Sequence, residues 1–346
     1  MRQNFRKTVK IALVLVYLVI IAGAVVRMTG SGMGCPDWPK CFGYYIPPTE
    51  LAELQFKPNH VYKKGIVIIV DEALQVSKVQ FTSGATLNLN NWEPYTAHDY
   101  ATFNPLHTWV EYINRLFGAL SGIPILIFTV MSIWLWKDRK RFLLLSIFTV
   151  VGMAFQAWLG KTVVDSNLAP YKITVHMVMA LVIVAVLLYL IFLAKTRFAK
   201  QTFDPLFKNV LLLATILTLV QIVLGTQVRQ FIDEQVKSIG YVKSLWMKNP
   251  ELDFYIHRSL SVLVLLINLW LFQRNRKLNL GYTKFRWVLV CIGLEIITGI
   301  AMYYFDFPFT TQPLHLVIAT ILIGIQFYII LESSRKPTIK LDGNLT

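Results

Sequence analysis

The chain has 346 residues, of which 55% are hydrophobic, and its mean hydropathy is +0.53. A composition this apolar over this length excludes an ordinary soluble domain and predicts several membrane-spanning helices. The formal net charge of +15 would suggest nucleic-acid binding in a soluble protein. Here the basic residues lie in short loops between apolar runs, so we expect membrane lipid, and no nucleic acid, around the chain.

Eight apolar runs approach the length of about 20 residues that a membrane-spanning helix needs. They cover roughly residues 9–27, 109–136, 142–160, 173–194, 207–228, 254–273, 285–304 and 312–332. Basic residues gather in segments 2–10, 137–141, 195–200, 274–277 and 335–336. Because cytoplasmic loops carry an excess of Lys and Arg, we expect both termini in the cytoplasm and segment 28–108 outside. The predicted fold class is an all-α polytopic membrane protein.

The first run has an alternative interpretation. Its basic start, its apolar core and the sequence Ala22-Gly23-Ala24 also fit a cleaved signal peptide. A membrane helix is favoured because the run is rather long for a signal core and because an internal repeat needs it. No Arg- and Ser-rich transit segment precedes it, which together with the basic loops predicts a bacterial cytoplasmic membrane.

The two halves of the chain resemble each other, which indicates a tandem repeat. EYINR at 111–115 corresponds to FYIHR at 254–258, and GAVVR at 23–27 corresponds to GTQVR at 225–229. KITVHMVMA around His176 corresponds to TQPLHLVIA around His315, and Gly160 corresponds to Gly299. The simplest architecture is two pseudo-symmetric four-helix bundles, residues 1–200 with the external loop 28–108, and residues 201–346. Such bundles build cofactor sites from side chains that face one another.

Three histidines lie inside predicted spans, where ionisable side chains are costly and usually functional. His176, His257 and His315 each lie about one turn inside the outer end of an even-numbered run, and Asn114 takes the matching position in the second run. His257 and His315 form a pair at equal depth, which is the pattern that bis-histidine haem requires. The alternative is a neutral histidine hydrogen-bonded within the core. Zinc is less favoured, because no carboxylate or thiol has ligand spacing beside them.

Four arginines are expected near the same depth. Arg27 and Arg229 end the first and fifth runs, and Arg115 and Arg258 directly follow Asn114 and His257. Guanidinium groups bind carboxylates bidentately, so these residues are candidates for the two propionates of a haem. The alternative is that they extend toward the membrane interface, as arginines at helix ends commonly do.

Glu111 makes the two halves chemically different. It lies one turn before Asn114 on the same helix face, whereas Phe254 occupies the corresponding place in the second half. This asymmetry predicts chemistry in the first half and a structural or electron-transfer haem in the second. The alternative for Glu111 is an interfacial carboxylate paired with Arg115. A further acid, Glu295, lies within the seventh run and corresponds to Gln156, with no role assigned.

Two features of the external segment predict local structure. The stretch from Gly65 to Phe81 is rich in valine and partly alternating, so it predicts a β-hairpin, either a lid over the outer mouth or a passive insertion. Two of the three cysteines lie close together in this segment, which suits a disulfide on an oxidising face.

Several motifs resemble those of the haem A synthases. They are VRMTGSGMGCPDWPKCFG at 26–43, EYINR, LGKTVVDSNLAP at 159–170, LGTQVRQFID at 224–233 and IHR at 256–258. The resemblance extends over about residues 26–330 and is weak from about 50 to 95. CPDWPKC and GTQVR are specific, whereas the lone histidines are not.

The resemblance implies an oxidoreductase that converts a methyl group of haem O into a formyl group, giving haem A for cytochrome oxidase assembly. It implies a haem b on His257 and His315, the substrate haem O on His176, and Glu111 as the catalytic acid. Cys35 and Cys41 match a pair able to form a disulfide. Many members have histidine where this chain has Asn114. Because an amide is a poor iron ligand, His176 alone is predicted to hold the substrate iron, with His107 as an alternative second ligand.

Partners and competing functions follow from the same resemblance and residues. A haem O synthase, which is a protohaem farnesyltransferase, would supply the substrate, and a terminal oxidase would receive the product. One alternative is a di-haem b electron carrier linked to quinone, against which the asymmetry at Glu111 and Asn114 argues. The other is a non-redox transporter of an anionic substrate built from tandem repeats, which would carry no haem.

Overall fold

The computed structural model describes residues 1–96, 103–137, 140–166 and 169–335. Two basic residues that support the predicted topology, Arg139 and Lys336, lie outside these ranges. Eight helices in the described part are long and apolar enough to cross a membrane, which confirms the eight predicted spans. They are α1 (Arg2–Thr29), α2 (Pro105–Trp134), α3 (Arg141–Asp165), α4 (Pro170–Leu193), α5 (Pro205–Ile239), α6 (Leu252–Lys277), α7 (Phe285–Tyr304) and α8 (Thr311–Ser333).

Helix α5 is longer than the sequence predicts. The apolar run ends near residue 228, but the helix continues to Ile239 and stops where Gly240 takes a φ of 72°. A hydropathy pattern ends where the apolar side chains end, whereas backbone hydrogen bonds continue through polar residues. In this extension Arg229 pairs with Asp233 at 2.7 Å, one helical turn apart, which is a spacing that supports a helix.

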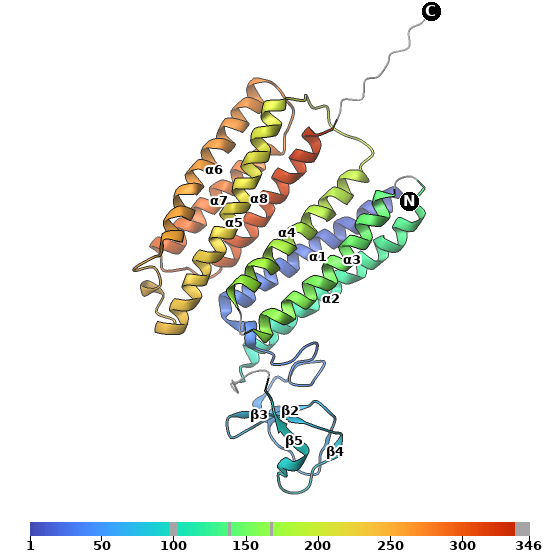
Figure 1. The fold of residues 1–346 in the computed structure, drawn as a ribbon, viewed down its shortest axis with the longest axis vertical. Coiled ribbons are helices and arrows are strands. Elements are labelled where there is room, and N and C mark those ends of the chain that lie inside the picture. Colours follow the sequence, from blue (N-terminus) through green and yellow to red (C-terminus); the bar gives the residue numbers. More distant parts are fainter. Residues whose placement is uncertain (97–102, 138–139, 167–168, 336–346) are drawn as a thin grey trace, which may run out of the picture. The chain divides into compact units, whose positions relative to one another are not determined.

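The chain forms two compact units. The first comprises residues 1–13, 127–149 and 181–346, and the second comprises residues 14–126 and 150–180. In the first unit α5 packs on α6, α6 on α7, α7 on α8 and α8 on α5, which closes a four-helix bundle (Figure 1). Its core consists of Phe207, Leu211, Phe285, Val288, Ile318, Leu322 and Ile329, among others.

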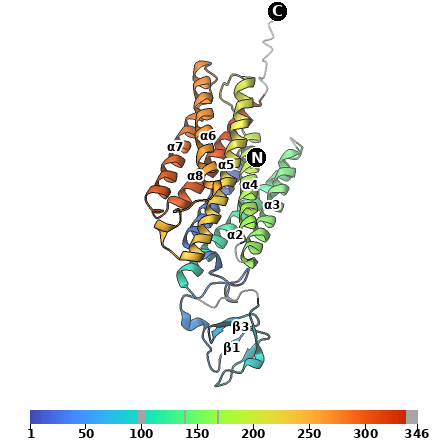
Figure 2. The ribbon, with the colours of Figure 1, turned by 60° about the vertical axis from the view of Figure 1, so that its left-hand side comes forward.

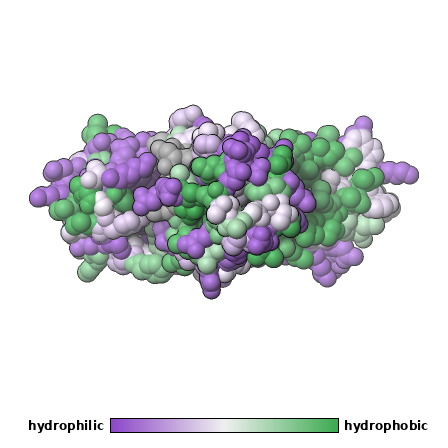
Figure 3. All heavy atoms as spheres, turned by 90° about the horizontal axis from the view of Figure 1, so that it is seen from below, coloured by the Kyte–Doolittle hydropathy of each residue, from purple (hydrophilic) through white to green (hydrophobic). Residues whose placement is uncertain are grey.

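Figure 2 shows the same bundle turned, with α5 to α8 still side by side. Apolar side chains on the outer faces of the helices remain open, including Ile133, Leu144, Leu266 and Ile297, each more than half exposed. Figure 3 shows apolar patches of this kind between hydrophilic ones on one face. In a bilayer such faces contact lipid, because the hydrocarbon region is as apolar as these side chains.

The start of α1, the end of α2 and the start of α3 belong to the same unit and share an aromatic contact. The ring of Phe5 lies edge-on to Phe128 at 5.8 Å and to Phe142 at 5.2 Å between centroids. Thr129 donates from its hydroxyl to the carbonyl of Ser146 at 3.4 Å. These contacts hold α2 and α3 together at this end.

The second unit contains the β structure of the external segment. Strands β2 (Val67–Val70) and β3 (Ala73–Ser77) pair antiparallel, and β3 pairs with β5 (Trp92–Pro94). Strands β1 (Val61–Tyr62) and β4 (Phe81–Thr82) form a second antiparallel pair. The β2–β3 turn is made by Asp71 and Glu72, both at positive φ, as two-residue hairpin turns require. The hairpin predicted within 65–81 is therefore confirmed, and the sequence did not predict the pairing with β5.

A buried carboxylate joins three segments at the end of α8. Glu332 is 3% exposed and accepts from Lys284 Nζ at 2.7 Å and from Gln201 Nε2 at 3.1 Å. Lys195, just after α4, lies 3.5 Å from the same carboxylate. Burial lowers the pKa of the Lys195 ammonium, while the Glu332 carboxylate opposes that shift. Glu332 therefore ties the end of α4, the linker to α5 and the start of α7 to α8.

Asp204 starts α5 and binds α6. Its Oδ1 accepts from the backbone N–H of Leu206 at 3.2 Å, as an N-cap side chain does. The same carboxylate accepts from Arg274 through Nε at 2.5 Å and Nη2 at 3.2 Å. The hydrogen bonds from Arg274 hold the pKa of Asp204 below its usual value, so this carboxylate stabilises the fold above the unfolded-state pKa and loses that effect as pH falls through the lowered value.

We expect D204A to lower the thermal stability of the detergent-solubilised protein, because the substitution removes the cap, worth about 1–2 kcal/mol, and leaves Arg274 without its partner. The matched control is D165A, which breaks the pair between Lys161 and Asp165, both nearly half exposed. Exposed pairs of this kind contribute little. Equal unfolding temperatures for D204A and D165A would contradict this account of α5.

Candidate functional site

The three histidines and Asn114, which occupy equivalent positions of the repeat, share one packing arrangement. Each side chain lies against a glycine of the preceding helix. The distances given are those from an atom of the side chain to the position that a Cβ atom on the glycine would occupy. The contacts are Asn114 Oδ1 at 3.7 Å from Gly23, His176 Cε1 at 3.5 Å from Gly160, His257 Cε1 at 3.2 Å from Gly225, and His315 Cε1 at 3.8 Å from Gly299. The pseudo-symmetry predicted from the sequence is thus present in the packing of α1 on α2, α3 on α4, α5 on α6 and α7 on α8.

His257 and His315 face each other inside the C-terminal bundle. Their ring centroids are 6.4 Å apart and the rings are inclined at 69°. A metal–imidazole bond of about 2 Å on each side, together with ring radii of roughly 1.2 Å, spans about 6.4 Å. The pair is therefore spaced to accept one metal ion between the two imidazoles.

The hydrogen bonds of the two rings differ. His315 Nδ1 lies 2.8 Å from Thr298 Oγ1 and 2.9 Å from Glu295 Oε2. His257 Nδ1 is buried with no hydrogen-bond partner among the described residues. Gln221 donates instead to the backbone carbonyl of His257 at 2.6 Å.

His176 in the other unit resembles His257 rather than His315. Its Nδ1 is buried without a partner in the described part of the chain, and Gln156 donates to its backbone carbonyl at 2.8 Å. Asn114 Oδ1 is also buried and unpartnered there. No hydrogen bond between described residues joins Asn114 to His176, so both side chains keep polar atoms available for a ligand.

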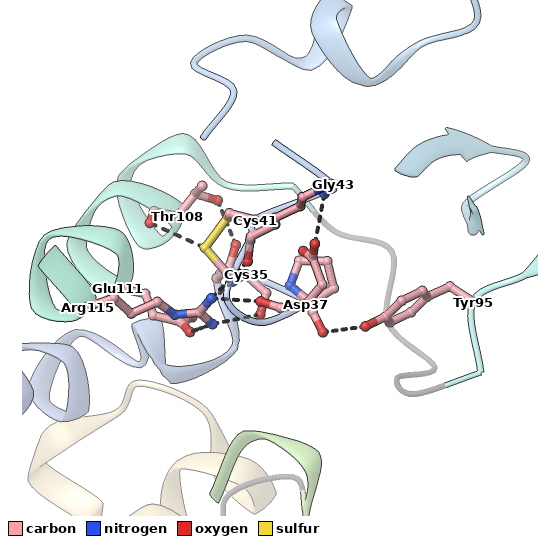
Figure 4. The surroundings of a disulfide bond; sticks show 11 residues. Cys35, Asp37, Cys41, Gly43, Tyr95, Thr108, Glu111 and Arg115 are labelled. Atoms are coloured by element: carbon pink, nitrogen blue, oxygen red, sulfur yellow. Dashed lines mark hydrogen bonds and ion pairs between the residues drawn. A yellow bond between two sulfur atoms is a disulfide. The ribbon is translucent and has the colours of Figure 1, made fainter. Parts of the chain in front are cut away.

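Glu111 is buried beneath the loop that carries the two cysteines (Figure 4). Its Oε2 accepts from the backbone N–H of Cys35 at 2.9 Å, and its Oε1 pairs with Arg115. Thr108, one turn earlier on α2, donates to the carbonyl of Gly34 at 2.8 Å. The start of α2 thus fixes this loop through two side chains, and the expected disulfide between Cys35 and Cys41 is present.

Arg115 contacts the backbone of the same loop. Its Nη1 donates to the carbonyls of Asp37 at 2.7 Å and Lys40 at 2.9 Å, and its Nη2 reaches the carbonyl of Cys35 at 3.5 Å. The pairing of Glu111 with Arg115 that the interfacial alternative assumed is present, and the catalytic role of Glu111 stays a prediction. Arg115 is used to hold the loop, and its assignment to a haem propionate stays a prediction.

Two titratable groups of the loop have shifted pKa values. Burial raises the pKa of the Asp37 carboxyl, although the N–H of Gly43, donating at 2.9 Å, opposes the shift. Burial also raises the pKa of Tyr95 to about 12. The Tyr95 hydroxyl donates to the carbonyl of Pro36 at 2.6 Å, which links β5 to the disulfide loop (Figure 4).

The other arginines have different surroundings. Arg229 pairs with Asp233 and donates to Gln312 at the start of α8, so it joins two helices of the C-terminal bundle. Arg258 is exposed in the second turn of α6, and Arg27 lies in the last turn of α1. In place of Glu111 the second half has Phe254, whose ring stacks on Tyr303 at 5.1 Å.

The sequence analysis named Glu295 and Gln156 without a role, and it did not identify Gln221, Thr298 or Gln312. Gln156, Gln221 and Glu295 each lie four residues before the glycine that faces a histidine, so they share a helix face with that glycine. The spacing from each glycine was a usable signal. Thr298 and Gln312 carried no such signal, because their contacts depend on how α7 and α8, or α5 and α8, are rotated against each other.

Comparison with known proteins gives one consistent result. Residues 6–81 and 90–327 match the family model COX15-CtaA, described as cytochrome oxidase assembly protein. The heme A synthase of Ehrlichia canis (strain Jake) is 25% identical over 343 residues, 91% of this chain and 89% of that protein. The heme A synthase of Wolbachia sp. subsp. Brugia malayi (strain TRS) is 25% identical over 354 residues, 94% of this chain and 96% of that protein. Because the family match spans most of the chain, this protein belongs to the COX15-CtaA family of cytochrome oxidase assembly proteins.

Proposed function

We propose that this chain is a haem A synthase, an oxidoreductase that converts a methyl group of haem O into a formyl group. The observation that carries the proposal is the difference between two equivalent sites. One has a facing histidine pair spaced for a metal, and the other has a single histidine with a buried carboxylate on the preceding even helix. Two relatives named heme A synthase support the same conclusion, because their alignments with this chain cover 89% and 96% of their own length.

The C-terminal bundle is the proposed haem b site, with His257 and His315 as the two iron ligands. The ring spacing and the space left by Gly225 and Gly299 fit this role. When bound, such a haem supplies one-electron transfer. Arg229 and Arg258 are the proposed partners of its propionates, because guanidinium groups bind carboxylates in a fixed geometry.

The N-terminal bundle is the proposed site of the substrate, haem O. His176 is the proposed iron ligand, because its ring is buried against Gly160 with a free Nδ1 among described residues. Asn114 lies at the equivalent position on α2, and Arg27 and Arg115 are the proposed propionate partners. Because an amide is a poor iron ligand, His176 alone would hold the iron of the substrate.

Glu111 is the proposed catalytic acid–base. A carboxylate here can take a proton from the hydroxylated methyl group or stabilise positive charge that develops on its carbon. Arg115 and the N–H of Cys35 fix both carboxylate oxygens, so the group is oriented before substrate binds. The disulfide loop covers this carboxylate and excludes water from it.

The proposal includes a cellular setting. The eight membrane helices are proposed to lie in a bacterial cytoplasmic membrane with both termini cytoplasmic and loop 28–108 outside, following the basic loops. Residues 1–200 and 201–346 are the proposed functional halves. A protohaem farnesyltransferase is the proposed source of haem O, and a terminal oxidase is the proposed recipient of haem A.

The direct test is co-expression with a haem O synthase, followed by haem extraction and analysis by chromatography and mass spectrometry. We expect haem A from the native chain and a loss of at least tenfold in E111Q, because the amide can neither accept the proton nor carry the charge. E93Q, which neutralises an exposed carboxylate in β5, is the matched control and should leave haem A unchanged.

Haem A in E111Q at the native level would refute the role of Glu111 while leaving the enzyme in place. A native chain that carries haem b and leaves haem O unconverted would instead support the di-haem electron carrier. A native chain that purifies without haem would support the transporter.

Packing at the glycines gives a second test of the haem b site. G225A places a Cβ 3.2 Å from His257 Cε1, closer than the ring tolerates without shifting, so we expect reduced haem b retention after purification. G299A places its Cβ at the ordinary distance of 3.8 Å from His315, and the space around Gly293 on α7 is open. Both G299A and G293A should retain native haem b, measured by the pyridine haemochrome. Equal retention in all three variants would show that the glycine contact does not matter.

A further inference from the structure

We propose that Glu295 is a positioning residue that makes His315 a stronger electron donor to a bound haem iron than His257. This inference rests on the proposed haem b site. The sequence assigns no role to the Glu295 carboxylate, which lies beside one ring nitrogen of His315.

Two acceptors surround His315 Nδ1. Thr298 Oγ1 lies 2.8 Å from it, and the Thr298 hydroxyl is itself within donating distance of the carbonyl of Leu294, also at 2.8 Å. A hydroxyl that donates its only proton to a carbonyl presents a lone pair to the ring. Glu295 Oε2 lies 2.9 Å from the same nitrogen, and a carboxylate there is an acceptor. We therefore assign the proton to Nδ1, with Glu295 as its acceptor.

The position of that proton decides which ring atom binds a metal. In a neutral imidazole with the proton on Nδ1, the lone pair is on Nε2. Histidines that bind metals commonly donate their other N–H to a carboxylate, which fixes the ring orientation and raises the basicity of the ligand. Glu295 and Thr298 thus prepare His315 Nε2 for iron before any haem arrives.

His257 lacks this arrangement. Its Nδ1 has no partner among the described residues, and Gln221 bonds to its backbone carbonyl rather than to its ring. Gln221, Gln156 and Glu295 occupy equivalent positions, each four residues before a glycine. One of the three is an acid, and that acid is the one that reaches an imidazole nitrogen.

Burial makes the carboxylate effective. The Glu295 side chain is 16% exposed and the His315 side chain 25%, so water screens their interaction weakly. Within the described residues, His315 Nδ1 is the side-chain nitrogen that lies within hydrogen-bond distance of the Glu295 carboxylate. A negative charge shared with an axial ligand favours the oxidised iron and lowers the reduction potential of the haem.

The test is a redox titration of the full-length purified protein with its haem, followed optically and by electron paramagnetic resonance. We expect E295Q to keep its haem with a midpoint potential more positive than native and with shifted low-spin g values. T298V should shift the potential less in the same direction, and E295D should return it toward native. E234Q, which removes an exposed carboxylate from α5 of the same bundle, controls for net charge and should leave the potential unchanged.

A haem-bound E295Q with the native potential would overturn the proposal. If E295Q binds no haem, the tautomer of His315 in the haem-free protein decides, measured by nitrogen-15 NMR. An Nδ1–H tautomer in the native chain that becomes mixed in E295Q supports the proposal, and an unchanged tautomer overturns it. A native chain without low-spin haem would refute the proposed haem b site, while the NMR result would still report on Glu295 by itself.

Discussion

A polar ring between two packed membrane helices needs space and hydrogen-bond partners, because the hydrocarbon region supplies neither. This chain provides the space in a comparable way four times, with a glycine opposite Asn114, His176, His257 and His315. At Gly225 a Cβ would stand 3.2 Å from the ring of His257, whereas at the other three glycines it would stand at an ordinary contact distance. The cost of glycine within a helix, about 1 kcal/mol relative to alanine, is accepted at these places because the ligand side chain fills the gap.

On this common arrangement the two halves have diverged. The C-terminal half keeps two histidines at ring-to-ring distance and fills the place of the acid with Phe254, which stacks on Tyr303. The N-terminal half keeps one histidine and a carboxylate bound to the disulfide loop. Under the proposed function, this scaffold would hold one group for electron transfer and another as a substrate, and the side chains that differ between the halves would set the chemistry of each.

Much of the fold could be predicted from the sequence, because a membrane helix is specified by the apolarity and the length of a local segment. All eight helices and the hairpin at 67–77 were predicted. The extension of α5 was not, because the charged and polar side chains interspersed in residues 229–239 end the hydropathy signal without ending the helix. The pairing of β3 with β5 depends on residues distant in the sequence, which a local pattern does not reveal.

The sequence indicated which residues belong to the candidate site, but it indicated few of the contacts that these residues make. The positions of His257 and His315 followed from the repeat, and the disulfide of Cys35 and Cys41 is present. The use of Arg115 to hold three loop carbonyls and the contact of Glu295 with His315 depend on helix rotation and loop conformation. Neither is encoded in spacing alone.

The central claim is that one haem b is held by His257 and His315, separately from the substrate site at His176. The most direct measurement is the haem b content and spin state of purified H257A, H315A and H176A, without co-expressed haem O synthase. We predict low-spin haem b in the native chain and in H176A, and loss of the low-spin signal in both H257A and H315A. Native low-spin haem b in H257A or H315A, or its loss in H176A alone, would contradict the account.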